Sequence, residues 1–114
     1  MYLYFRSDGK IIKAGPYNPN HCTNGTMAYR RSYMLTHRYD EKQTHAEEKS
    51  FLDDYKNPMI QLDPFKCILV MCHADNTFDK NNLRNSNNPL LKETPMKINF
   101  FIKDKALREF FISC

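Results

Sequence analysis

Short runs of hydrophobic residues, separated by polar segments, predict several strands. Residues 2–14 are typical of a β-hairpin, because both halves are strand-forming and Asp8-Gly9 between them favours a two-residue turn with positive φ. Residues 65–72 form an apolar run with the length and composition of a buried strand. Residues 96–102 are predicted as a further strand.

Amphipathic spacing predicts two helices. Residues 45–55 are expected to be helical, with Thr44 as the N-cap and acidic residues in the first turn. Four apolar side chains fall near one face of this helix: Ala46, Phe51, Leu52 and Tyr55. Residues 105–111 are also amphipathic and are predicted as the last helix. For residues 27–35 the pattern fits either a short helix or a strand, and both stay open.

Polar segments connect these elements. Residues 15–20 contain Pro16 and Pro19 and break regular structure after the hairpin. Residues 73–95 are polar and rich in Asn, and we expect a long loop with one short helix there. The sequence has no internal repeat and no linker. The order of elements therefore predicts a single α/β domain over residues 1–114, in which helices flank a central sheet.

Composition adds few constraints. The 114 residues include 41% hydrophobic positions, with 8 Phe and 7 Tyr, which argues for a folded protein. A net charge of +4 tolerates a phosphate-bearing ligand, although an ordinary basic surface is the better interpretation of charge alone. The sequence has neither a signal-peptide pattern nor an apolar run of roughly 20 residues, the length of a membrane span. We therefore expect a cytoplasmic protein without membrane contact, in the producing cell or in a host cell. Its four cysteines are then expected to be thiols or metal ligands rather than disulfides.

The segment Thr44-His45-Ala46-Glu47-Glu48 carries candidate chemistry. An imidazole can hold a zinc ion, and a carboxylate two residues later can move protons to and from water on that ion. The tripeptide alone is also compatible with an ordinary helix start that has acidic residues in its first turn. The residues that precede this segment help to choose between the two interpretations.

That context is the preceding hairpin and loop. Residues 7–19 read Ser-Asp-Gly-Lys-Ile-Ile-Lys-Ala-Gly-Pro-Tyr-Asn-Pro, and His21-Cys22 follows before His45-Ala46-Glu47. This succession resembles the cytidine and deoxycytidylate deaminase superfamily, in which a hairpin of the form D-G-x-I-I-x-x-G-Y-N precedes the H-A-E helix start. A His-Cys pair often occurs in the intervening loop of the deoxycytidylate branch. The resemblance covers residues 2–55, about half of the chain.

The resemblance implies a cytidine deaminase-like fold with a central mixed sheet and a zinc cofactor. It makes His45 a zinc ligand, Glu47 the proton shuttle and Asn18 a candidate contact to the substrate sugar. The implied function is hydrolytic deamination of a cytosine-type base, in a free nucleotide or in single-stranded nucleic acid. His21 and Cys22 could belong to a second metal site, or could simply be loop residues.

The second half of the chain departs from the family pattern. The family has a strand followed by P-C-x-x-C, whereas here the strand runs into Cys72-His73-Ala74-Asp75-Asn76-Thr77. Aligning Asp75-Asn76 with the central pair places Ala74 and Thr77 where cysteine ligands are expected. Cys72 and His73 could supply a rearranged zinc site, but neighbours on a regular strand point to opposite faces, so this needs a bend.

Two other interpretations remain. The fold could persist without catalysis, as a viral or mobile-element type of inhibitor or binding protein that sequesters a nucleotide or a partner protein. The missing P-C-x-x-C motif and the Asn-rich loop favour this alternative. The resemblance could also be accidental, since its motifs are short.

Overall fold

The computed structural model describes residues 1–16, 18–44, 46–76 and 80–113, and the chain divides into two compact units. The sheet unit combines Met1–Pro16 with Asp63–Cys114, and the insert unit is the continuous stretch Tyr17–Leu62. None of the helices in the described ranges has the length and apolar composition needed to cross a membrane. The single domain predicted over residues 1–114 stays a prediction.

The predicted hairpin is confirmed. β1 (Tyr2–Phe5) and β2 (Lys10–Ala14) pair antiparallel, with Phe5 opposite Lys10 next to the turn. The expected two-residue turn is wrong, because the turn spans residues 6–9 and only Gly9 among them has a positive φ, +68°. The Gly9 N–H donates to the Phe5 carbonyl over 2.8 Å, and the Asp8 carboxylate accepts from the Lys10 N–H. These bonds stabilise the longer turn.

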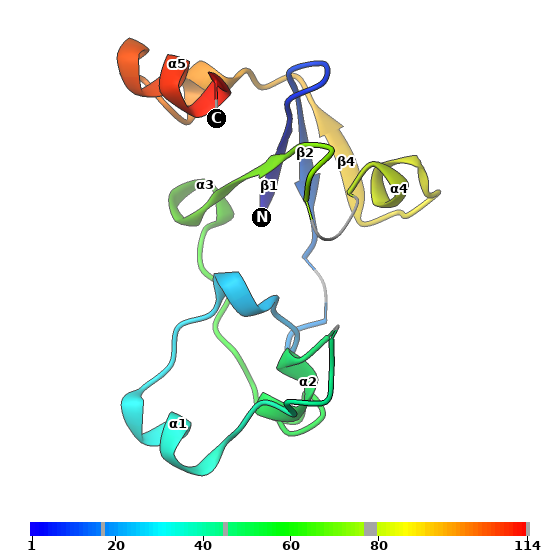
Figure 1. Cartoon of the computed structure of the whole chain (residues 1–114), viewed down its shortest axis with the longest axis vertical. Helices are drawn as coiled ribbons and strands as arrows, with labels where there is room; N and C mark the ends of the chain where they lie inside the picture. Colours follow the sequence, from blue (N-terminus) through cyan, green and yellow to red (C-terminus); the bar gives the residue numbers. More distant parts are fainter. Residues whose placement is uncertain (17, 45, 77–79, 114) are drawn as a thin grey trace. The chain divides into compact units, whose positions relative to one another are not determined.

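Two further strands complete a mixed sheet (Figure 1). β3 (Leu69–Cys72) runs parallel to β1, and β4 (Leu91–Thr94) runs antiparallel to β2, which gives the order β3-β1-β2-β4. The expected architecture, an α/β arrangement with a central mixed sheet flanked by helices, is therefore present.

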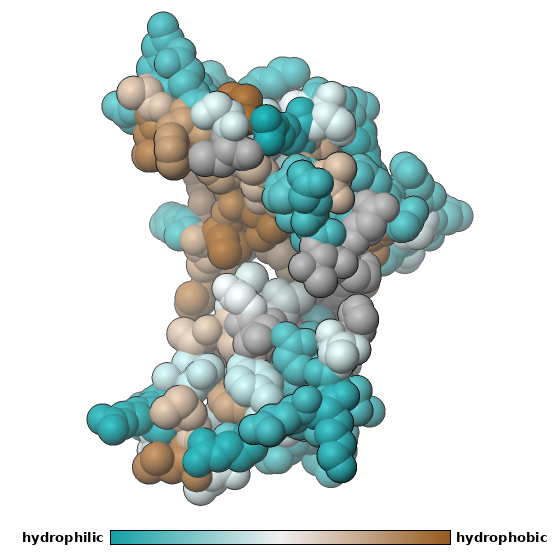
Figure 2. Space-filling model, viewed as in Figure 1, coloured by the Kyte–Doolittle hydropathy of each residue, from teal (hydrophilic) through white to brown (hydrophobic). Residues whose placement is uncertain are grey.

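One face of the sheet packs against the C-terminal part of the chain. Tyr2, Tyr4 and Ile11 are buried there, and the partly buried Phe101 and Phe111 pack against them. Phe111 belongs to α5 (Lys105–Ser113), which confirms the predicted C-terminal helix. α5 also leaves two apolar side chains exposed, Leu107 and Phe110. Figure 2 shows apolar atoms, in brown, beside polar ones, in teal, on one face of the molecule.

The opposite face of the sheet is equally apolar. Alternation along the strands places a second buried set there: Leu3, Phe5, Ile12 and Ala14. On this side α4 (Lys80–Asn85) contributes Arg84, whose guanidinium lies 4.8 Å from the centre of the Phe5 ring. The same guanidinium donates to Asp8 over 2.7 Å. α4 is the short helix expected within residues 73–95.

The other strand predictions need correction. Residues 65–67 are not strand but part of α3 (Pro64–Cys67), because Asp63 accepts the Phe65 N–H as N-cap and Pro64 favours the first helical position. The strand of the apolar run begins only at Leu69. Residues 96–102 are also not a strand. They contain the 3-10 helix η2 (Ile98–Phe100), and the missed strand β4 precedes them.

The insert unit contains short helices: η1 (Asn24–Thr26), α1 (Arg31–Thr36) and α2 (Glu48–Phe51). Of residues 27–35, for which a helix and a strand were both open, residues 31–35 are helical and belong to α1. The helix expected over residues 45–55 is wrong in extent, because Ala46 has φ +54° and α2 is a single turn. Thr44 is not its N-cap, since Glu47 holds that position without a side-chain cap bond. After α2 the backbone is left-handed at three successive residues: Asp53, Asp54 and Tyr55.

Candidate functional site

The predicted site residues are divided between the two units. Four of them belong to the insert unit: Asn18, His21, Cys22 and Glu47. Cys72 and His73 belong to the sheet unit, at and just after the end of β3. His45 lies outside the described residues, so its predicted role as a zinc ligand stays a prediction.

Within the insert unit, His21 and Cys22 lie near the residues of α2. The His21 ring packs on Tyr55, with ring centres 5.0 Å apart and planes inclined by 36°. Burial raises the pKa of the Cys22 thiol, and the charge of Glu48 raises it further. Burial also raises the pKa of Tyr55, followed by the charges of Glu48, Cys22 and Glu47. We call these five residues the Glu47–Glu48 cluster: His21, Cys22, Glu47, Glu48 and Tyr55.

Glu48 is one of two members of this cluster, with Tyr55, that the sequence prediction did not name as site residues. It is 9% exposed and is the only charged residue that is buried in the described part of the chain. α2 starts at Glu48 and also buries Phe51, three residues later on the same face. The spacing of Glu48 from Phe51 and Leu52 was visible in the sequence. Because the predicted helix began at residue 45, Ala46 rather than Glu48 was expected on its buried face.

Glu47 occupies the N-cap position of α2 and is half-buried. Its charge contributes to the raised pKa of Tyr39, after burial of that phenol and the neighbouring Tyr29. Glu47 is therefore close to both Tyr39 and Tyr55.

Asn18 shapes the loop that leads to this cluster. Its side-chain oxygen accepts the Asn20 N–H over 2.9 Å, and its carbonyl accepts the His21 N–H over 2.9 Å. The residue is exposed. The side-chain oxygen thus accepts a hydrogen bond within the turn, and the predicted contact of Asn18 with a substrate sugar stays a prediction.

Cys72 and His73 have partners within the sheet unit. Cys72 is buried, and this burial raises the pKa of its thiol, while Lys80 acts in the opposite direction. Asn76 contacts His73 at two points. Its side-chain oxygen accepts the backbone N–H of His73 over 3.0 Å, and its amide nitrogen lies 3.0 Å from His73 Nε2. Because an amide nitrogen only donates, His73 Nε2 is the acceptor of this bond. Asp75 lies 3.8 Å from the other ring nitrogen.

The zinc ion that the resemblance implies would need at least three protein ligands close together. Among the described residues, no three His, Cys, Asp or Glu side chains gather closely enough to hold one ion. The described part of the chain therefore does not fit a zinc site by itself.

The sequence prediction also missed a histidine–aspartate pair in the insert unit. His37 Nε2 lies 3.0 Å from the Asp53 carboxylate, and His37 Nδ1 lies 2.9 Å from the Tyr33 carbonyl. The Asn57 amide donates to both Asp53 and the Tyr33 hydroxyl. No local motif joins these residues, because the contacts depend on how α1 packs on the turn after α2.

Comparison with protein-family models, with curated proteins and with solved structures gives no match. The resemblance to deaminases therefore rests on the sequence motifs alone.

Proposed function

We propose that the protein acts on a cytosine-type base of a nucleotide or of single-stranded nucleic acid, with the deaminase-like activity that the resemblance implies. The observation that carries the proposal is the Glu47–Glu48 cluster. In this cluster Glu47 and Glu48 have Tyr55 as a common neighbour with His21 and Cys22, and both pairs belong to the motifs on which the resemblance rests.

The chemistry of this cluster suits a cytosine ring. Cytosine presents its exocyclic amino group as a hydrogen-bond donor, and a Glu carboxylate is a matching acceptor. Glu47 and Glu48 supply two such carboxylates, and Tyr55 and His21 supply flat rings beside them. In this proposal Glu47 accepts and returns the proton of the reaction, while Glu48 holds the amino edge of the base.

The arrangement of the sheet also supports the proposal. The hairpin, the helix start after it and the next strand follow in the order of the family pattern, and that strand pairs parallel with β1. Zinc would supply Lewis-acid activation of water in this family. Since the described residues do not fit a zinc site, no step of the reaction is assigned to a metal here.

The experiment measures zinc and deamination on the same purified protein. We expect conversion of dCMP, CMP or a cytosine-containing DNA oligonucleotide, and the zinc content of the same sample is determined by mass spectrometry. Glu47→Gln should abolish conversion and leave the zinc content unchanged. The matched control is Glu41→Gln, which alters an exposed carboxylate of the same unit and should retain activity. A wild-type protein that converts none of these substrates would remove the enzyme proposal.

A second candidate is a deaminase-like binding protein without catalysis. Two of the predicted zinc ligands favour it. His73 is paired with Asn76, and Cys72 is buried. Under this alternative, Glu47→Gln binds dCMP in calorimetry as wild type does and neither protein converts it. A Glu47→Gln protein that no longer binds dCMP would contradict this candidate.

A further inference from the structure

The two edge strands of the sheet differ in character. β3 and β4 lie at opposite edges of the order β3-β1-β2-β4, and neither has a second strand partner among the described residues. β4 reads Leu-Lys-Glu-Thr, and its Glu93 forms an ion pair of 2.8 Å with Lys10. Charged residues on an edge strand discourage pairing with another chain. β4 is protected in this way.

β3 has no such protection. It reads Leu-Val-Met-Cys, without a charged residue or a proline. The residues before it add apolar surface, because Ile68 is 38% exposed and Phe65 is 39% exposed. An uncharged apolar edge strand is a template for strand addition.

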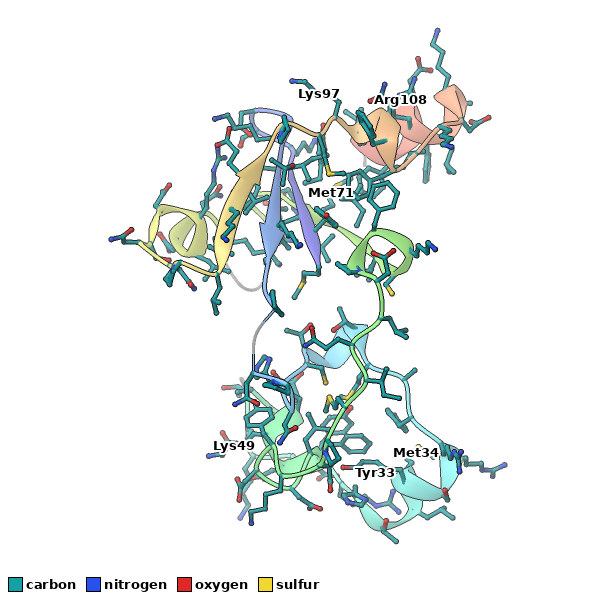
Figure 3. The ribbon with its side chains drawn as sticks, turned by 180° about the vertical axis from the view of Figure 1, so that it is seen from behind. Tyr33, Met34, Lys49, Met71, Lys97 and Arg108 are labelled. Carbon is teal, nitrogen blue, oxygen red and sulfur yellow. The ribbon has the colours of Figure 1, made fainter. Side chains whose placement is uncertain are left out.

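The ladder to β1 determines which groups of β3 face outward. The Arg6 N–H donates to the Cys72 carbonyl over 3.0 Å, so the main-chain groups of Cys72 point to β1. Alternation directs those of Val70 to β1 as well. The N–H and C=O groups of Leu69 and Met71 therefore point away from β1, toward the open edge. Met71 is labelled in Figure 3, which shows the sheet from behind.

We infer that β3 pairs antiparallel with β3 of a second copy of this chain. With the two-fold axis at Val70, Leu69 meets Met71 of the second copy, and both residues present outward main-chain groups that bond to each other. The facing side chains are Leu with Met and Val with Val, so no like charges meet. This self-complementarity is what favours a second copy over a different partner. The inference is independent of the proposed deamination.

The first experiment compares oligomeric state by sedimentation velocity over a range of concentrations. Wild type should dimerise, and Met71→Leu should behave in the same way because it keeps the N–H. Met71→Pro removes an N–H that makes no bond to β1, so it should weaken dimerisation about tenfold or more while thermal unfolding of the monomer is retained. A wild-type protein that stays monomeric, or that enlarges only with another protein, would overturn the inference.

Two further measurements keep the test decisive if Met71→Pro fails to fold. Hydrogen exchange of wild type should show protection at the Leu69 and Met71 amides that is lost on dilution. In a chain with Cys67→Ser and Cys114→Ser, Val70→Cys should form an intermolecular disulfide, because facing residues at the axis have Cα atoms about 4.5 Å apart. Lys92→Cys, on the other edge, is the matched control and should not. Amides that exchange at the same rate at all concentrations would overturn the pairing.

Discussion

His37 lies flat against Tyr33, with ring centres 3.6 Å apart and planes inclined by only 7°. The two residues are one turn apart on and after α1, and their polar atoms connect α1 to the segment that follows α2. The Tyr33 hydroxyl donates to the Phe51 carbonyl over 2.9 Å, and Figure 3 shows Tyr33 pointing from α1 in that direction. Phe51 is 1% exposed and also packs against Tyr29 and Tyr39. The stacked pair thus covers the centre of the insert unit.

Asp53 should make the stability of this unit depend on pH. Hydrogen bonds from His37 and then Asn57 lower the pKa of Asp53 below its ordinary value. A lowered pKa contributes stability that is full above the unfolded value of about 3.9 and is lost as pH falls through the folded pKa. The stability difference between wild type and Asp53→Asn should therefore shrink on acidification, as measured by urea unfolding at several pH values.

Asp40→Asn is the control for that experiment. The Asp40 carboxylate accepts the Lys42 N–H, and an Asn carbonyl can accept the same bond. Its stability difference from wild type should stay constant over the same pH range. If both variants followed the same pH dependence, the His37–Asp53 bond would not be the cause.

The reactivity of Cys22 should report on Glu48. Burial is the larger cause of the raised pKa of Cys22, and the Glu48 charge adds to it. Glu48→Gln should therefore lower this pKa in part and increase the thiolate fraction, so that iodoacetamide alkylates Cys22 faster near pH 8. The rate is measured by mass spectrometry of the Cys22 peptide. Glu109→Gln, an exposed carboxylate of the sheet unit, should leave the rate unchanged.

The elements that the sequence predicted are those determined by neighbouring residues. The hairpin over residues 2–14 depends on strand-forming residues and on Gly9, which has the positive φ of the turn. α5 depends on an amphipathic spacing that is complete within the helix itself. In both segments the local preference and the tertiary packing agree, so the pattern was sufficient.

The failures have a different physical origin. Residues 96–102 have strand-forming composition, but Phe101 packs on the buried Tyr2, with ring centres 5.0 Å apart. That contact joins distant parts of the chain, and a local pattern does not contain it. The missed Glu48 has a more local cause, because the reversal of φ at Ala46 delays the start of α2 and changes which carboxylate is buried.

Arg84 should hold the carboxyl group of Asp8 in its ionised form. The hydrogen bond from Arg84 is the largest cause of the lowered pKa of Asp8. Arg84→Ala should raise this pKa toward its ordinary value, as followed by NMR titration of the side-chain carboxyl. Arg84→Lys should retain only part of the effect, because an ammonium lacks the planar group that lies over Phe5. Arg108→Ala, which removes bonds to the Ile102 and Lys103 carbonyls, should not change the Asp8 titration.

The left-handed segment after α2 offers a stabilising substitution. Asp54 has φ +55°, a conformation that is unfavourable for a side chain and freely available to glycine. Asp54→Gly should therefore raise the free energy of unfolding by about 0.5–1 kcal/mol. Lys49→Gly, within α2, should lower it by about the same amount. Equal effects of the two variants in chemical denaturation would contradict this explanation.

The parallel register of β1 with β3 also determines when the sheet can be completed during synthesis. Tyr2 pairs with Leu69, so β1 waits for residues that are made after the whole insert unit. At about 5–20 residues per second, that interval lasts several seconds, whereas a hairpin forms in about 1–10 μs. β1 and β2 therefore remain a marginal hairpin until β3 is made, and its apolar faces stay uncovered until α4 and the C-terminal residues follow. The nascent chain is most vulnerable to misassociation in this interval.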